Sequence, residues 1–299
     1  MRFIQKAFAR VLRYVPDGIV HALLAPLPAT LRGKLRHRFA RLRFYQFMKK
    51  RLGKFIVEIE SGTVGDVNLI MRTAVLKEED ASKKLDPDHY FESGYVQMQA
   101  WMQTLERCGL NLRTLGAIME VGCGSARLIR HLRCMEGVRL VGADVKPEMI
   151  EWCSKNVPGI EFYSNGLEPP LPFANDAIFD LIFMSSVFTH IPRETQLLWI
   201  KEMYRVLRPG GYLLCDVLGR YHQELMLDTA DRARLKKDGE LTLTAADAKA
   251  SLSTKLIGSW DYFQTRAEVV RVFGSVFTLV DYIPSYLDLL VLKKPRSAS

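Results

Sequence analysis

A glycine-rich turn that follows a carboxylate is the segment of this sequence best suited to bind a ligand. Glu120 ends an apolar run, Gly122 and Gly124 follow it at once, and a helical pattern begins near Ala126. A strand that turns into a helix in this way presents backbone N–H groups at the strand end, beside the carboxylate. The segment therefore predicts a crevice for a nucleoside-type ligand.

The spacing around this turn distinguishes between kinds of nucleoside ligand. A dinucleotide-binding turn carries Gly at its first, third and sixth positions, but the sixth position here is Arg127. Asp144 ends the next apolar run, twenty residues after Gly124, where a carboxylate accepts hydrogen bonds from both ribose hydroxyls. These residues favour a nucleoside with a free ribose over a pyrophosphate cofactor, and the carboxylate of Glu120 suits a cationic part of that ligand.

Apolar runs alternate with helical patterns through the second half of the chain. We expect strands at 115–121, 138–144, 160–163, 178–184 and 212–217, and helices at 96–108, 127–136, 147–156, 195–207 and 266–273. Strands separated by helices pair in parallel with helices on both faces, which predicts a doubly wound, Rossmann-like α/β sheet. Two further runs, 277–283 and 287–292, flank a short turn, so the last of seven strands is expected to run antiparallel.

The positive charge of the chain is concentrated near its N-terminus. Residues 1–54 hold fourteen Lys or Arg residues and one acid, so their charge of +13 against a net +9 leaves −4 for the rest. We divide the chain into a basic helical extension with its linker, residues 1–89, and a domain at 90–295. The basic surface is expected to belong to the extension and not to the domain. The polar residues 219–260, with little strand signal, are expected to form an insertion over the pocket.

Three functions remain open for the basic extension. They are contact with an anionic membrane surface, a helical lid packed on the domain with a solvated basic face, and an RNA contact. Apolar residues recur among its cations at helical spacing, and this pattern fits lipid contact and packing equally.

The composition argues against several other classes of protein. The five cysteines are odd in number and include no C-x-x-C pair, so we expect neither a disulfide framework nor a zinc site, and a reduced, cytoplasmic compartment. The six histidines are scattered, so no metal site is expected. No apolar run approaches the roughly 20 residues that span a bilayer.

Several motifs, in a fixed order, resemble those of class I S-adenosylmethionine-dependent methyltransferases. The resemblance covers residues 90–295 and is closest to the bacterial branch associated with surface-polysaccharide or other small-molecule biosynthesis. The motifs are Glu120-Val-Gly-Cys-Gly-Ser-Ala126, Gly142-Ala-Asp144, Asn165-Gly166, Pro170-Leu-Pro-Phe173, the run from Phe179 to His190, Tyr204-Arg-Val-Leu-Arg-Pro-Gly-Gly211 and the run from Tyr286 to Pro295.

The resemblance implies a role toward S-adenosylmethionine for each matching residue. Glu120, Gly122 and Gly124 would contact its methionine part, Asp144 its ribose, Asn165 and Gly166 its adenine edge, and Ser185 would close the pocket; Cys123 and Val145 belong to the same set. Ala126 departs from the family, which most often has a third glycine there, and its methyl group narrows the loop.

Methyl transfer from a sulfonium needs alignment and, for a hydroxyl acceptor, removal of a proton. His190, after the fourth strand, and His222, in the insertion, are the candidate bases, because an unperturbed imidazole titrates near neutrality. The alternatives are a wall residue for His190 and a solvated loop histidine for His222.

We expect transfer to a small-molecule, glycan or lipid-linked acceptor, at oxygen, by a cytoplasmic protein. Contact with the inner membrane face through residues 1–54 is one of the three functions left open for the extension. An RNA methyltransferase anchored by the basic arm is the less expected alternative, and a non-catalytic methyltransferase-like binding protein is another.

Overall fold

The computed structural model of the chain describes residues 87–244, 246–247 and 260–296. The basic N-terminal segment, almost all of the 1–89 extension and the centre of the 219–260 insertion lie outside the described residues. The helices and strands are α5 (Pro87–Arg107), η3 (Leu112–Thr114), β1 (Ala117–Val121), η4 (Ile129–Cys134), β2 (Arg139–Asp144), α6 (Pro147–Asn156), β3 (Glu161–Ser164), β4 (Phe179–Met184), α7 (Arg193–Val206), β5 (Leu207–Val217), α8 (Arg220–Met226), α9 (Thr229–Asp238), β6 (Glu240–Thr244), β7 (Trp260–Gln264), α11 (Arg266–Gly274), β8 (Thr278–Ile283) and β9 (Asp288–Lys293).

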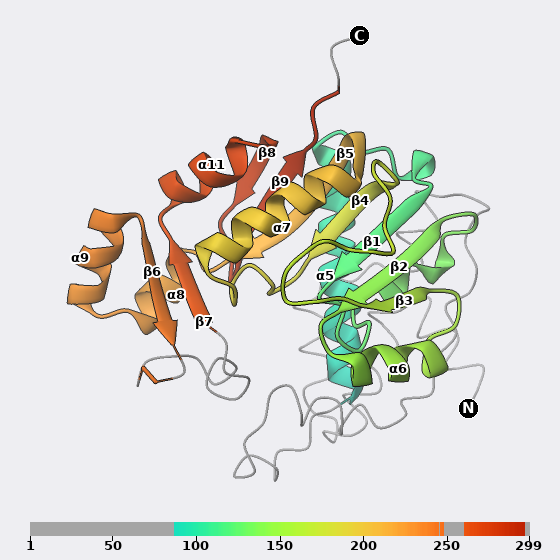
Figure 1. The fold of residues 1–299 in the computed structure, drawn as a ribbon, viewed down its shortest axis with the longest axis horizontal. Coiled ribbons are helices and arrows are strands. Elements are labelled where there is room, and N and C mark those ends of the chain that lie inside the picture. The colour runs from blue at the N-terminus through green and yellow to red at the C-terminus, as the bar shows by residue number, and fades with distance from the viewer. Residues whose placement is uncertain (1–86, 245, 248–259, 297–299) are drawn as a thin grey trace, which may run out of the picture.

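Seven of these strands form one sheet in the order β3-β2-β1-β4-β5-β9-β8 (Figure 1). Strands β1 to β5 pair in parallel, and β9 pairs antiparallel with both β5 and β8. The predicted doubly wound sheet with a reversed last strand is confirmed. Strand order reverses at β1, which lies between β2 and β4, so the crevice at the carboxyl ends of these strands is where a ligand binds in such folds.

Side chains that alternate along the central strands fill two separate cores. Ile118 packs toward α5, η4 and α6, whereas its neighbour Met119 packs toward α7 and α11. This alternation is the expected consequence of the two-residue period of a strand that is covered on both sides. Helices α5 and α7 accordingly lie on opposite faces of the sheet (Figure 1).

The prediction of a regular helix at 127–136 is wrong. The chain forms the 3₁₀ helix η4 at 129–134 instead. Ala126, at φ +58°, takes the left-handed conformation that glycine adopts at no steric cost, which turns the chain away from a regular helical start. The N–H of Ile129 then donates to the carboxylate of Glu120 at 3.0 Å, so it does not donate to a backbone carbonyl within a helix.

The 219–260 segment has more regular structure than its sequence indicates. Its described part contains α8, α9 and strand β6, which pairs antiparallel with β7. Five leucines from and next to these elements, together with Phe263, form a third, smaller apolar cluster. The elements themselves lie beside the main sheet (Figure 1). Asp228 accepts from the N–H of Asp231 and caps α9, and Gly239 at φ +83° ends it, as expected for cap residues. In the part of the chain that is described, no helix combines the length and apolarity of a membrane span.

Candidate cofactor and active site

The glycine turn lies at the carboxyl end of β1 and is fastened to β2. The N–H groups of Gly122 and Cys123 both donate to the carbonyl of Ala143, at 2.8 and 3.0 Å. Gly122 and Gly124 have φ values of +75° and +51°, in the left-handed region that favours glycine. The turn is therefore held close to the end of β2, where Asp144 follows.

Asp144 joins the turn to the next strand end. One oxygen accepts from the N–H of Gly124 at 2.8 Å, and the other accepts from the N–H of Lys146 at 3.0 Å. A carboxylate has about four acceptor positions, so acceptor capacity remains for a diol. Asp144 is buried, and burial raises the pKa of its carboxyl, against the lowering effect of both N–H bonds.

Asn165 lies on the far side of Asp144, after β3. Its N–H donates to the carbonyl of Asp144 at 3.1 Å, and its side-chain Nδ2 donates to the carbonyl of Gly166. The side-chain oxygen of Asn165 is buried and has no hydrogen-bond partner. A buried acceptor without a donor is costly, so this atom is suited to receive an amino group from a ligand.

Glu120 lies beneath the turn rather than on its surface. Only 2% of the residue is exposed, and Oε2 is occupied by the N–H of Ile129. Burial raises the pKa of this carboxyl to about 8, although the Ile129 N–H bond and the field of Arg127 lower it. In this conformation Glu120 offers no exposed oxygen to a ligand, and below about pH 8 the folded protein keeps its carboxyl protonated.

The remaining residues of the predicted cofactor set differ in what they can offer. Val145 is 43% exposed beside Asp144 and presents an apolar surface at the pocket edge. Cys123 is buried, with its sulfur packed toward Gly142 of β2, so only its backbone lies in the turn. Gly166 is exposed.

Ser185 follows β4 and lies in a chain of side-chain hydrogen bonds. Its hydroxyl accepts from Gln97 Nε2 and donates to Asp216 Oδ2, both at 3.2 Å. Asp216 was not predicted as a site residue. It lies at the end of the apolar strand β5, as Asp144 lies at the end of β2. That shared position was a signal that could have found it.

His190 is held by β7, a strand that was not predicted from the sequence. Its Nδ1 lies 3.0 Å from the carbonyl oxygen of Trp260 and 3.9 Å from Asp261 Oδ1. Strand β7, which carries both partners, is docked by the N–H of Tyr262 on the carbonyl of Thr189 at 3.0 Å. Asp261 is 1% exposed, so a buried carboxylate lies beside the imidazole. It was missed because β7 was not predicted.

His222 is not a solvated loop residue. It is 7% exposed, on α8, and its ring packs edgewise against Tyr221 and Tyr286 with centroids at 5.3 and 4.5 Å. Burial lowers the pKa of its imidazole, while a hydrogen bond with the Tyr286 backbone and the fields of Asp261 and Asp288 act against this. Both predicted histidines therefore lie within the influence of one carboxylate, Asp261.

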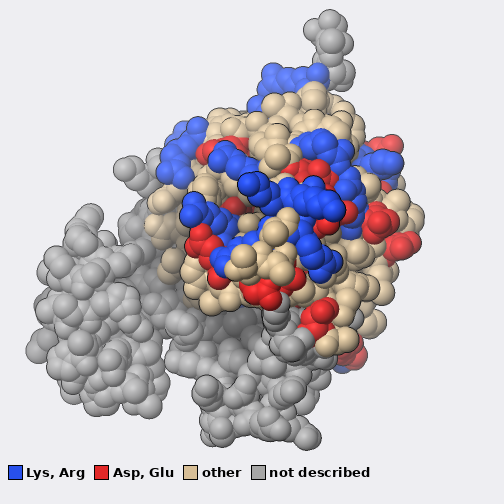
Figure 2. Space-filling model, turned by 90° about the vertical axis from the view of Figure 1, so that its left-hand side faces the viewer, with Lys and Arg blue, Asp and Glu red and all other residues tan. Residues whose placement is uncertain are grey.

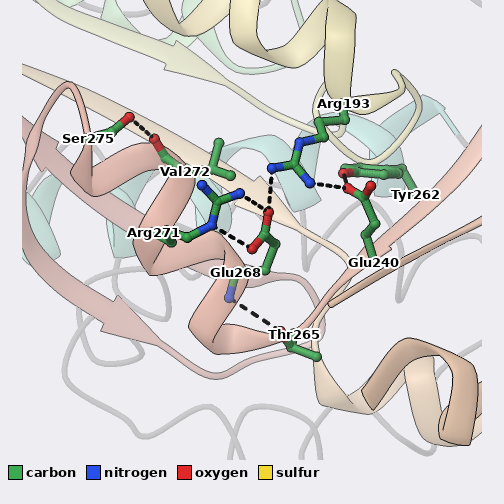
Figure 3. Close-up of polar contacts among 8 residues, drawn as sticks. All are labelled: Arg193, Glu240, Tyr262, Thr265, Glu268, Arg271, Val272 and Ser275. Carbon is green, nitrogen blue, oxygen red and sulfur yellow. Dashed lines mark hydrogen bonds and ion pairs between the residues drawn. The ribbon is translucent and has the colours of Figure 1, made fainter. Parts of the chain in front are cut away.

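An ion-pair network ties the β6–β7 hairpin to the main domain (Figure 3). Arg193, at the start of α7, contacts Glu240 of β6 at 3.2 Å and Glu268 of α11 at 2.9 Å. Glu240 also accepts a hydrogen bond from the hydroxyl of Tyr262 on β7. The network fixes the strand that positions His190.

The expectation that basic surface is confined to the N-terminal extension is wrong. Lys and Arg side chains also gather on the face of the domain formed by α9 and α11, with acids among them (Figure 2). Exposed members are Arg232, Arg234, Lys236, Lys237, Arg266 and Arg271. A net charge of −4 after residue 54 conceals this local accumulation, because net charge carries no information on placement.

Comparison with known proteins shows similarity to methyltransferases over part of the chain. Residues 119–215 match the family model described as a methyltransferase domain. The chain is 30% identical over 172 residues to a phthiotriol/phenolphthiotriol dimycocerosates methyltransferase of Mycobacterium leprae, covering 56% of this chain and 60% of that protein. It is 36% identical over 105 residues to a malonyl-[acyl-carrier protein] O-methyltransferase of Hahella chejuensis, covering 34% of this chain and 36% of that protein.

Further similarities come from an RNA-modifying relative and a solved structure. The chain is 27% identical over 177 residues to a tRNA N(3)-methylcytidine methyltransferase of Schizosaccharomyces pombe, covering 51% of this chain and 68% of that protein. A solved S-adenosylmethionine-dependent methyltransferase of Methanosarcina mazei is 21% identical with a TM-score of 0.46, covering 60% of this chain and 93% of that one.

Residues 119–215 are therefore similar to methyltransferase domains, and the seven-stranded sheet with its reversed last strand is the fold expected for class I S-adenosylmethionine-dependent methyltransferases. It spans 60% of the length of the Mycobacterium leprae relative and 36% of the Hahella chejuensis one. The narrower assignment to a bacterial surface-polysaccharide branch stays a prediction.

The residues at the carboxyl ends of β1, β2 and β3 fit S-adenosylmethionine. Gly122 and Gly124 turn the backbone through the left-handed region, Asp144 keeps acceptor capacity beside them, and the buried oxygen of Asn165 lacks a donor. Among the described residues, no group of three or more His, Cys, Asp or Glu side chains has the arrangement of a metal site.

Proposed function

We propose that this protein transfers the methyl group of S-adenosylmethionine to an oxygen atom of a small-molecule, glycan or lipid-linked acceptor. Two relatives support an apolar or acyl-bearing acceptor, since their names specify dimycocerosates and malonyl-[acyl-carrier protein]. The second of these is named an O-methyltransferase, which supports oxygen as the atom that is methylated.

The residues proposed to hold the cofactor are those of the glycine turn and of the ends of the next two strands, β2 and β3. Gly122, Gly124 and Glu120 serve the methionine part, Asp144 the ribose, and Asn165 the adenine edge. The cofactor supplies an activated methyl group, so the chain itself must orient the acceptor, exclude water and accept a proton.

His190 is the proposed proton acceptor, and the observation that carries this role is its contact with a carbonyl. A carbonyl oxygen only accepts, so Nδ1 of His190 carries the hydrogen that donates to Trp260, and Nε2 keeps its lone pair. When Nε2 takes the proton of an acceptor hydroxyl, the nearby carboxylate of Asp261 stabilises the imidazolium.

The catalytic role of His222 stays a prediction with weaker support. Its Nδ1 is buried without a hydrogen-bond partner, and its ring is enclosed by two tyrosines. An imidazole in that position needs a local rearrangement before it can reach an acceptor.

The decisive experiment follows the methyl group. The full chain is incubated with methyl-labelled S-adenosylmethionine and separated lipid, glycan, small-molecule and RNA extracts, with heat-treated protein as a control. We expect label in a lipid, glycan or small-molecule fraction. Label confined to RNA would favour the tRNA-like alternative, and no label in any fraction would favour a binding protein without catalysis.

The cofactor assignment is tested separately by calorimetry. Asp144→Ala should weaken S-adenosylmethionine binding by about 10- to 100-fold, because a charge-assisted hydrogen bond contributes roughly 1.5–3 kcal/mol. Asp180→Asn is the matched control. Asp180 accepts the N–H groups of Gly116 and Ala117 at the amino ends of β4 and β1, the ends that lie away from the glycine turn. Equal affinity in the wild-type and Asp144→Ala proteins rejects the assignment.

A further inference from the structure

Asp216 is a buried carboxylate at the end of β5, and both of its oxygens serve the loop after β4. Oδ1 accepts from the N–H of Ser186 at 2.6 Å, and Oδ2 accepts from the hydroxyl of Ser185 at 3.2 Å. The residue is 2% exposed, so a ligand in the crevice has no direct access to it. Its influence on the crevice has to pass through the loop that it binds.

The loop bound by Asp216 adopts an unusual conformation and touches the glycine turn. Ser186 has φ +56°, a value that is uncommon for any residue other than glycine. At the next position, Val187 Cγ2 occupies the space beside Gly122, where an added Cβ would lie 2.4 Å away. A backbone held in this region requires partners that over-determine it, and the two bonds to Asp216 supply them.

The same loop is bound from the other side by helix α5. Gln97 Nε2 donates to the hydroxyl of Ser185 at 3.2 Å, and Gln97 Oε1 accepts from Arg127 at 2.5 Å. Arg127 also donates to the hydroxyl of Ser93 at 3.2 Å. A continuous chain of hydrogen bonds therefore links β5, the loop after β4, α5 and the segment that follows the glycine turn.

Arg127 also acts electrostatically on this arrangement. Its positive charge lowers the pKa of Asp216 and that of Glu120, although burial dominates and raises both, Asp216 to about 7. The residue at the third glycine position of a dinucleotide turn is thus a cation whose field reaches two buried acids.

We propose that Asp216 is a positioning residue of the cofactor pocket, which fixes the loop Ser185–Val187 against the glycine turn and, through Ser185 and Gln97, fixes α5. The inference deepens the proposed function and rests on it. Asp216 Oδ2 accepts the hydrogen of Ser185, so the lone pairs of that hydroxyl face Gln97. Removal of Asp216 frees the hydroxyl and releases the strained loop.

The test measures the affinity for S-adenosylhomocysteine by calorimetry, which requires no acceptor. Asp216→Ala should weaken binding by about 10-fold, the effect of one to two lost hydrogen bonds. Asp216→Asn should recover only part of this loss, because the amide oxygen still accepts from the Ser186 N–H whereas the amide NH2 cannot accept from the Ser185 hydroxyl. Asp180→Ala is the matched control. It removes a carboxylate that accepts two backbone N–H bonds at the amino ends of β4 and β1, and its affinity for S-adenosylhomocysteine should equal that of the wild type.

A double-mutant cycle separates positioning through Ser185 from a general loss of structure. Ser185→Ala and Asp216→Ala should be non-additive, because both remove the same hydrogen bond. If Asp216→Ala does not fold, judged by circular dichroism, the cycle is run with Asp216→Asn, which must still differ from the wild type and couple to Ser185→Ala.

Two results would overturn the inference. The first is wild-type affinity in the folded Asp216 variants, and the second is an equal loss of affinity in Asp180→Ala. Failure of the proposed function is distinguishable from both, because the wild-type protein itself would then bind neither S-adenosylmethionine nor S-adenosylhomocysteine.

Discussion

Replacement of Glu120 by glutamine tests the electrostatics of the pocket through the stability of the fold. Glu120 is 2% exposed, and burial raises its pKa from 4.5 to about 8. Glutamine has nearly the same shape and its side-chain oxygen can also accept from the N–H of Ile129. The substitution therefore removes the titration while keeping the contact.

The sign of the effect follows from which state holds the proton. Between pH 4.5 and about 8 the unfolded chain releases the Glu120 proton and the folded chain keeps it. The folded state then binds more protons, so the free energy of unfolding falls by about 1.4 kcal/mol per pH unit as the pH rises through this window. Glutamine makes no such contribution, so the stability of Glu120→Gln relative to the wild type should increase by roughly 3 kcal/mol from about pH 5 to about pH 7.

Urea unfolding of the ligand-free protein, followed by circular dichroism at constant ionic strength, measures this difference. Any fixed cost of burying the glutamine amide shifts the two curves by a constant and leaves their divergence unchanged. Stability curves that stay parallel between about pH 5 and pH 7 would refute the reasoning and place the carboxyl near its ordinary pKa.

A second consequence of the raised pKa concerns binding. If the cationic part of S-adenosylmethionine lies within the field of Glu120, binding lowers the pKa of the carboxyl, and the complex releases protons near neutral pH. Calorimetry in buffers with different ionisation enthalpies should detect this release in the wild-type protein. Glu120→Gln should release fewer protons, and equal release from both proteins argues against the placement.

Three further substitutions have expected outcomes. His190→Gln should lower the rate of methyl transfer by about 10²- to 10⁴-fold with unchanged cofactor affinity, as for loss of a general base, and an unaltered rate argues against that role. Gly122→Ala should destabilise the protein by about 1–3 kcal/mol more than Gly137→Ala, because both glycines have φ near +75° but only Gly122 faces a side chain, Val187; equal thermal shifts contradict this. Arg193→Met should expose the β6–β7 hairpin to limited proteolysis by removing two ion pairs, whereas unchanged cleavage would mean that the network does not hold it.

The sequence was sufficient for the main sheet because its strands carry strong local signals. Buried parallel strands such as β1 and β4 are continuous apolar runs, and the acid and glycines at their ends mark the crevice. The segment after the glycine turn was harder, because the conformation of Ala126 and the bond from Ile129 to Glu120 are tertiary effects that helical periodicity does not encode.

The proposed acceptor side of the site was less predictable than the proposed cofactor side. Strand β7 has the sequence WDYFQ, which lies after a polar stretch and pairs with a partner about twenty residues earlier. Burial of Asp261 depends on this long-range pairing and on docking to Thr189, so no local pattern identifies it. The cofactor side, in contrast, is built from turns whose residues are adjacent in the sequence.

The pairing of β5 with β9 delays completion of the sheet while the protein is being synthesised. Strand β5 lies at an open edge of the sheet until residues 288–293 have been made, some seventy residues after it. Unpaired edges attract other extended chains, so a partly synthesised protein exposes a segment prone to association with its neighbours. The strand that stays unpaired on this side during synthesis is the one that carries Asp216.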